Sequence, residues 1–102
     1  MQPSPALELS VYRVVQEALT NAGKHAPSSR VAVKVAYTDQ AVEVEVVDDG
    51  TGARSLDLPG SGNGLAGMRE RVALFNGGFD AGPKQGGGFR VWARFPLGEP
   101  SL

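Results

Sequence analysis

Residues 41–52 read AVEVEVVDDGTG, and this stretch shows the clearest structural pattern in the chain. Its valines at 42, 44 and 46 alternate with glutamates at 43 and 45. Because successive side chains of a β-strand point to opposite faces, this alternation predicts a strand with one buried and one solvent-exposed face. The strand runs directly into DDGTG, whose Asp-Gly dipeptide is typical of a turn.

The flanking residues predict the neighbours of this strand in a sheet. Residues 31–38 alternate in the same way, and Asp39-Gln40 supplies a tight turn, so we expect an antiparallel hairpin in which each strand buries one face. A short strand and a glycine turn then precede a final strand at Phe89–Phe95. Its inward side chains are expected to be Phe89, Val91, Ala93 and Phe95, and its outward ones Arg90, Trp92 and Arg94. On the exposed surface, we expect Lys34, Arg90 and Arg94 to face Glu43 and Glu45.

Two helices are predicted by the spacing of apolar residues. From Ala6 to about His25 these residues recur with a period near 3.6, with Ser4 as the candidate N-cap and Pro5 at the first helical position. A second helix is expected from about Leu65 to Phe75. The predicted fold class is therefore a single α+β domain over residues 1–102, a two-layer sandwich with helices on one face of a mostly antiparallel sheet.

Composition excludes several classes of function. The chain has 102 residues and no cysteine, which excludes disulfides, thiolate zinc sites and cysteine nucleophiles. One histidine excludes any site that needs two imidazoles, and a net charge of −1 gives no overall basic footprint for nucleic acid. No apolar run approaches about 18 residues and no signal peptide is recognisable, so we expect neither a membrane span nor secretion.

The polar side of the first predicted helix suggests chemistry. Arg13, Glu17, Asn21, Lys24 and His25 follow one another at mostly helical spacing and form a continuous stripe. Asparagine is a poor residue for a helix interior, and a carboxamide one turn from a carboxylate, with a lysine beyond, suits a Mg²⁺–phosphate site. The alternative is a solvated helix face with an Arg13–Glu17 ion pair.

The glycine-rich segments allow two interpretations each. In DDGTG, Gly50 and Gly52 would let a ligand approach the backbone, and a carboxylate at the strand end could accept a hydrogen bond from an exocyclic amine; a plain turn explains the segment equally well. The segment GSGNGLAGMRER (60–71) is interpreted as a glycine loop that leads into a helix N-terminus, where phosphate can bind. The alternative is a plain helix cap and linker. The segment matches the dinucleotide pattern G-x-G-x-x-G formally, but no strand immediately precedes it. Gly86–Gly88 is expected to be a flexible turn.

Four segments in this order resemble a known family. QEALTNAGKHA (16–26), DDGTG (48–52), GNGLAGMRER (62–71) and GGGFRVWARFPL (86–97) are similar to the N, G1, G2 and terminal glycine boxes of the GHKL, or Bergerat, ATP-binding fold. The sequences of these segments most resemble the catalytic domain of bacterial two-component sensor histidine kinases that work with LuxR-type response regulators. The resemblance covers about residues 7–97.

The resemblance implies a role for each matching residue of the first helix. Asn21 would hold Mg²⁺ through its side-chain oxygen, and Lys24 and His25 would lie near the phosphates of ATP. Glu17 occupies the position of the water-activating base in ATPase relatives such as gyrase. In kinases of this type, it is expected to support the geometry of Mg²⁺ or phosphate.

The glycine boxes would hold the rest of the nucleotide. By the resemblance, Asp48 would accept a hydrogen bond from the adenine amino group, and Gly50 and Gly52 would let the ring approach. Gly62 and Gly64 would close a lid over the phosphates, with Leu65 beside them. Met68 is expected in the core rather than against the nucleotide.

The chain also departs from the family pattern. Phe89 stands where the family often has a threonine, so an adenine-side hydroxyl is missing at that position. The preceding strand and the dimerisation helices with the phospho-accepting histidine are not recognisable, which suggests the nucleotide domain of a larger kinase. The implied partners are that dimerisation domain and, indirectly, a LuxR-type response regulator, with a cytoplasmic location for this domain. The alternatives are an anti-sigma-factor-type serine kinase and a nucleotide-binding module without turnover.

Overall fold

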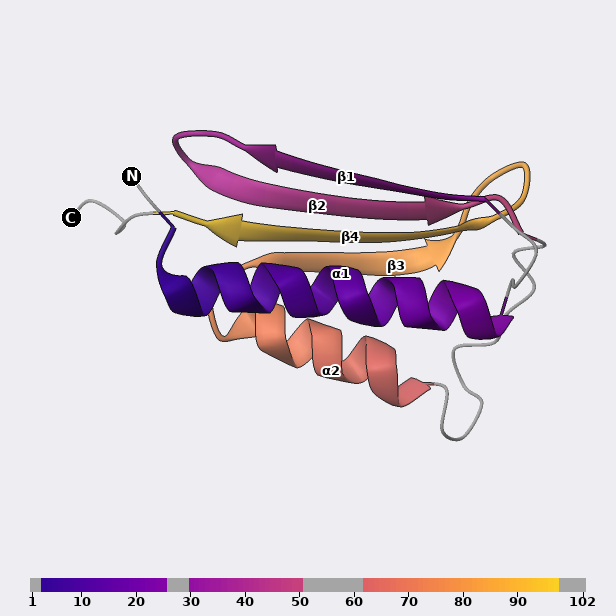
Figure 1. Cartoon of the computed structure of the whole chain (residues 1–102), viewed down its shortest axis with the longest axis horizontal. Coiled ribbons are helices and arrows are strands. Elements are labelled where there is room, and N and C mark those ends of the chain that lie inside the picture. Colours follow the sequence, from indigo (N-terminus) through magenta and orange to yellow (C-terminus); the bar gives the residue numbers. More distant parts are fainter. Residues whose placement is uncertain (1–2, 26–29, 51–61, 98–102) are drawn as a thin grey trace.

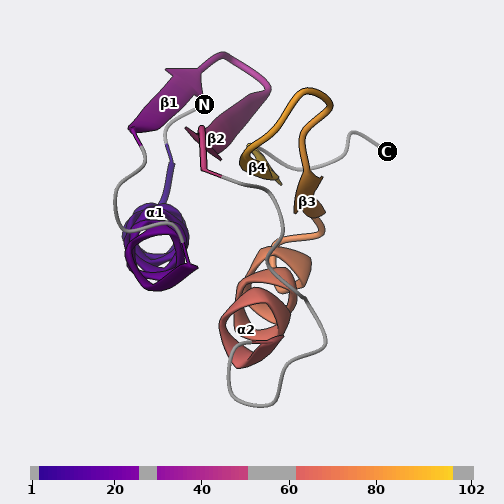
Figure 2. The ribbon, with the colours of Figure 1, turned by 90° about the vertical axis from the view of Figure 1, so that its right-hand side faces the viewer.

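A computed structural model describes residues 3–25, 30–50 and 62–97 (Figure 1). The elements follow in this order: α1 Pro5–His25, β1 Val31–Tyr37, β2 Ala41–Asp48, α2 Gly62–Ala73, β3 Gly78–Pro83 and β4 Phe89–Pro96. The strands form one sheet in the order β1-β2-β4-β3, and each neighbouring pair is antiparallel. Both helices lie on the same face of the sheet (Figure 2). The predicted two-layer α+β sandwich is confirmed.

Helix α1 begins as its sequence predicts. The backbone N–H of Leu7 donates to Ser4 Oγ at 3.1 Å, so Ser4 is the N-cap and Pro5 the first helical residue. The buried side of the helix carries an apolar stripe: Leu7, Val11, Val14, Ala18 and Ala22. Because this stripe packs on the sheet, it fixes the direction in which the polar residues of α1 point.

The core lies between the helices and the two central strands. The valines of β2 and the alternate residues of β4 face it: Val42, Val44, Val46, Phe89, Val91, Ala93 and Phe95. From α2, Met68 and Val72 fill the other side. Phe95 is fully buried, and its ring meets that of Phe75 edge-on at a centroid distance of 5.8 Å.

The prediction that β1 buries one face is wrong. All seven residues of β1 are exposed, including Val33 at 43%, although its cross-strand partner Val46 is only 3% exposed. The reason is position: β1 is an edge strand with a neighbour on one side only, and α1 contacts β2 more than it contacts β1. Alternation indicates which residues share a face, and it does not indicate whether another layer covers that face.

Helix α2 starts earlier than predicted, because residues 62–64 of the glycine loop already form its first turn. Its end is set by Asn76, which adopts a left-handed conformation at φ 59°, while the N–H of Gly77 donates to Val72 O at 3.1 Å. Within the described ranges, neither helix is both long and apolar enough to cross a membrane.

Candidate functional site

Four segments that are distant in the sequence lie at the same end of the domain (Figure 1). They are the C-terminal ends of α1 and β2, the N-terminal end of α2, and the turn between β3 and β4. These segments contain the polar stripe and the three glycine-rich motifs of the sequence. The fold therefore brings the described parts of four separate stretches to the same end of the domain.

Helix α1 contributes Glu17 and Asn21, which lie one turn apart near its C-terminal end. Glu17 is half-buried, whereas Asn21 is only 7% exposed. Among the described residues, the Asn21 carboxamide has no hydrogen-bond partner. Its polar atoms are not completely buried, because every completely buried polar side-chain atom in the described part of the chain has a partner. Lys24 and His25 complete α1, and their side chains lie outside the described part.

Strand β2 ends on two consecutive aspartates with different partners. Asp48 is 3% exposed, and its Oδ1 accepts a hydrogen bond from the N–H of Gly50 at 3.0 Å. Asp49 is exposed, and its Oδ1 accepts from the N–H of Arg30 at 2.7 Å, a contact that the sequence did not reveal. Asp49 therefore ties the end of β2 to the start of β1, while Asp48 places a carboxylate on the helix-facing side of the sheet beside Phe89.

Helix α2 directs its N-terminus toward the same end of the domain. Residues Gly62 and Gly64 belong to its first turn, which contains no acidic residue. The free backbone N–H groups and the helix dipole make such a terminus favourable for phosphate. Leu65 is half-buried against the core, and Met68 is buried within it, which confirms the expected core position of Met68. Gly52 lies outside the described residues.

The donor set fits a magnesium ion that is shared with phosphate. Among the described residues, no three or more Asp, Glu, His or Cys side chains cluster as a metal site. Mg²⁺ prefers oxygen ligands and commonly keeps water and substrate phosphates among them. The buried carboxamide of Asn21, with Glu17 one turn away, suits an ion of this kind.

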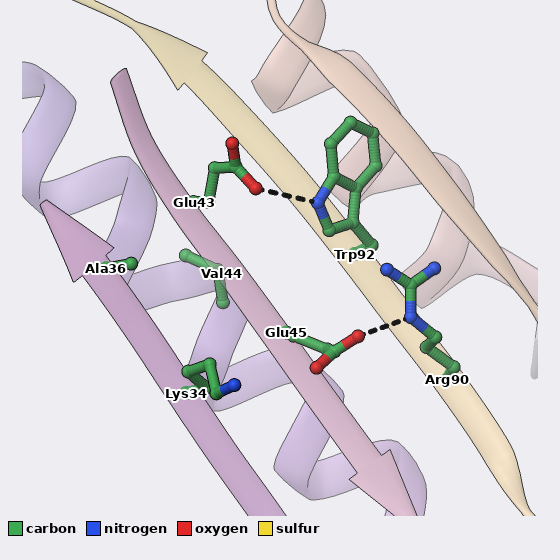
Figure 3. Close-up of a pocket in the computed structure, with 7 residues that line it drawn as sticks. All are labelled: Lys34, Ala36, Glu43, Val44, Glu45, Arg90 and Trp92. Atoms are coloured by element: carbon green, nitrogen blue, oxygen red, sulfur yellow. Dashed lines mark hydrogen bonds and ion pairs between the residues drawn. The ribbon is translucent and has the colours of Figure 1, made fainter. Parts of the chain in front are cut away.

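The face of the sheet opposite the helices carries paired charges (Figure 3). Arg90 Nε lies 2.5 Å from Glu45 Oε2, and Trp92 Nε1 donates to Glu43 Oε1 at 3.3 Å. Arg94 pairs with Glu43 at 3.5 Å, so the expected pairing of both arginines is confirmed. Lys34 lies opposite Glu45 in the register but forms no ion pair with any residue that the structure describes.

Comparison with known proteins identifies the family. A model described as histidine kinase-, DNA gyrase B- and HSP90-like ATPase matches residues 6–99. The chain belongs to this family. The GHKL resemblance seen in the four sequence motifs is thereby confirmed, and with it ATP as the expected nucleotide.

Two curated relatives are histidine kinases. The chain is 35% identical over 97 residues to the signal transduction histidine-protein kinase/phosphatase DegS of Bacillus subtilis (strain 168), covering 92% of this chain and 25% of DegS. It is 47% identical over 72 residues to the oxygen sensor histidine kinase NreB of Staphylococcus carnosus (strain TM300), covering 70% of this chain and 21% of NreB. The chain thus spans a quarter or less of these two relatives.

Solved structures share the fold. The histidine kinase domain of the blue-light activated kinase EL346 from Erythrobacter litoralis superposes with a TM-score of 0.69 at 29% identity, covering 86% of this chain and 43% of that one. Full-length ShkA in complex with AMPPNP gives a TM-score of 0.73 at 21% identity, covering 94% of this chain and 23% of ShkA. These matches confirm the α+β architecture of an ATP-binding domain of histidine kinases.

Proposed function

We propose that this chain binds Mg²⁺-ATP and donates the γ-phosphoryl group to a histidine on a separate dimerisation domain of a two-component sensor kinase. The observation that carries the proposal is that the described parts of four family motifs lie at the same end of the domain (Figure 1). The identity to DegS and NreB supports a histidine kinase over a serine kinase of the anti-sigma-factor type. In this proposal the domain is cytoplasmic, and a LuxR-type response regulator receives the phosphoryl group from the kinase.

The base of the nucleotide would bind at the end of β2. The Asp48 carboxylate is a hydrogen-bond acceptor, and its burial excludes water that would compete with an exocyclic amine. Adenine presents such an amine, whereas guanine presents a carbonyl oxygen at the same position of the ring. Gly50, which donates to Asp48 Oδ1, and Gly52 would leave room for the ring beside the backbone.

The phosphates would lie between the two helices. Asn21 would hold Mg²⁺ through its carboxamide oxygen, Glu17 would support the ion or the phosphates, and Lys24 and His25 would contribute charge and hydrogen bonds. Gly62 and Gly64 would place backbone N–H groups over the phosphates, with Leu65 at the junction with the core. When bound, Mg²⁺ would neutralise charge on the phosphates, so that the chain itself mainly positions the γ-phosphoryl group for in-line transfer.

The base assignment is tested by Asp48→Asn. An amide presents donors as well as an acceptor, so the variant should lose most of the preference for an amino group. Losing a hydrogen bond to a buried charged group costs roughly 1.5–3 kcal/mol, and ATP affinity should therefore fall at least about tenfold. Isothermal titration calorimetry with Mg²⁺-ATP measures this, with Asp49→Asn as the matched control at the neighbouring exposed carboxylate. Equal affinity of Asp48→Asn and wild type would remove Asp48 from the base site.

The metal assignment is tested by Asn21→Ala. In the wild type, we expect ATP affinity to fall when EDTA removes Mg²⁺, whereas in the variant the Mg²⁺-dependent part should be reduced by about tenfold because an oxygen ligand is missing. Titrations with and without Mg²⁺ separate this effect from a general loss of binding. Gln16→Ala, an exposed polar residue of the same helix, is the control. An undiminished Mg²⁺ effect in Asn21→Ala would contradict the assignment.

A further inference from the structure

The turn between β3 and β4 packs against the end of β2. Its three glycines, Gly86, Gly87 and Gly88, have φ values of 90°, 112° and 95°, a region that L-residues with side chains rarely adopt. Two backbone hydrogen bonds hold the turn: Lys84 N–H donates to Gly88 O at 2.9 Å, and Gly87 N–H donates to Lys84 O at 3.2 Å. The turn is therefore a defined structure, although its sequence suggested only flexibility.

The three glycines differ in what surrounds them. A Cβ at Gly86 would meet nothing within 4 Å, and one at Gly87 would lie 3.8 Å from Gly50 O. A Cβ at Gly88 would overlap the carbonyl oxygen of Asp48 and lie 3.2 Å from Asp48 C and 3.3 Å from Asp49 Cα. These are backbone atoms of the neighbouring strand, which cannot move aside as a flexible side chain would. Gly86 is thus needed only for its conformation, whereas Gly88 is also needed for its size.

The close contact of Gly88 falls on the residue proposed to bind the base. Asp48 is held from two directions: its backbone abuts Gly88, and its carboxylate accepts from the N–H of Gly50. Phe89, the next residue after Gly88, is the cross-strand partner of Asp48 and is 2% exposed. Moving the backbone of Asp48 away from residue 88 would therefore move the buried carboxylate as well.

We infer that Gly88 is a positioning residue for base recognition, which sets the place of the Asp48 carboxylate by allowing the β3–β4 turn to approach β2 without a side chain. This inference rests on the proposed nucleotide site. It assigns base discrimination to a residue of the turn between the last two strands, 40 positions from the carboxylate proposed to contact the base (48 to 88). A hydrogen bond needs a donor–acceptor distance of about 2.7–3.2 Å, so a displaced Asp48 carboxylate should bind the base more weakly.

The experiment compares Gly88→Ala with Gly86→Ala and Asp48→Asn. Both alanine variants introduce a Cβ at an unfavourable φ, but only Gly88→Ala brings that Cβ onto Asp48. Calorimetry with Mg²⁺-ATP, Mg²⁺-GTP and Mg²⁺-tripolyphosphate separates the base from the phosphates. We expect Gly88→Ala to bind ATP at least tenfold more weakly than Gly86→Ala, to bind tripolyphosphate equally, and to lose the preference for ATP over GTP.

Thermal unfolding of each variant shows whether a loss of binding reflects a loss of the folded state. If Gly88→Ala does not fold in buffer, the titrations of all variants are repeated in 1 M trimethylamine N-oxide, which favours the folded state. A Gly88→Ala chain that is still unfolded there, or one that loses ATP and tripolyphosphate affinity to the same extent, would overturn the inference, because Gly88 would then serve the fold rather than the base.

The remaining outcomes distinguish the inference from the proposal beneath it. If Asp48→Asn weakens ATP binding while Gly88→Ala behaves like Gly86→Ala, the base site stands and the role of Gly88 is refuted. If Asp48→Asn binds ATP like the wild type, the base site itself is refuted, and the inference with it.

Discussion

Incubated with radiolabelled ATP and Mg²⁺, this chain is expected to bind nucleotide and to acquire no acid-labile phosphate of its own. Its single histidine, His25, is the last residue of α1, within the segment proposed to contact the phosphates. Phosphoryl transfer requires the attacking nitrogen to lie in line with the departing oxygen, and small misplacements lower the rate by orders of magnitude. We therefore expect a residue of the helix proposed to hold the phosphates not to act as the acceptor.

Under the proposed function, supplying the helical dimerisation domain of a sensor histidine kinase in trans should place acid-labile label on the added domain. The labelling should be weak, because no linker raises the effective concentration of the acceptor. Asn21→Ala is the control and should abolish it. Label that appears on the 102-residue chain alone and disappears in His25→Gln would show that His25 is an acceptor. Acid-stable label on a serine of a partner would favour the serine-kinase alternative.

Truncation of Phe95 to alanine is expected to cause the largest loss of stability. Phe95 is fully buried near the end of the central strand β4 and packs edge-on against Phe75. Removing such a side chain costs about 3–5 kcal/mol, compared with a total of about 5–15 kcal/mol for a typical domain. Urea denaturation, followed by the fluorescence of Trp92, should show a midpoint lower by about 2 M, or a chain already unfolded without urea.

Leu74→Ala provides the matched control for this measurement. Leu74 is also apolar but 81% exposed, so its truncation should change the free energy of unfolding by about 0.5 kcal/mol or less. Similar midpoints for Phe95→Ala and Leu74→Ala would contradict the position of Phe95 in the core.

Local patterns in the sequence predicted most of the elements. The period near 3.6 gave α1 with its N-cap at Ser4, and the alternation of valine and glutamate gave β2 with its buried side. Both patterns arise from geometry within one element, so a single sequence contains them. Asn21 was also recognised from local sequence, because asparagine has a low propensity for the interior of a helix.

The features that the sequence did not predict depend on neighbours. The exposure of β1 follows from its place at the edge of the sheet, which the alternation of Val31, Val33 and Val35 does not encode. The packing of Gly88 against Asp48 joins segments whose proximity depends on the strand order. The family motifs identified Asp48 as a candidate. The need for a glycine at position 88 follows only from the assembled sheet, in which Gly88 lies against the backbone of Asp48.

The strand order has a consequence for the time at which the protein becomes functional during its synthesis. Strand β2 pairs with β4, so the surroundings of Asp48 are complete only after residues 89–96 have been made and have docked. At about 5–20 residues per second, a ribosome needs about 2–8 s to travel from Asp48 to Phe89. If Asp48 binds the base as proposed, the nascent chain has no finished base site throughout that interval, and we expect ATP binding only after β4 has paired with β2.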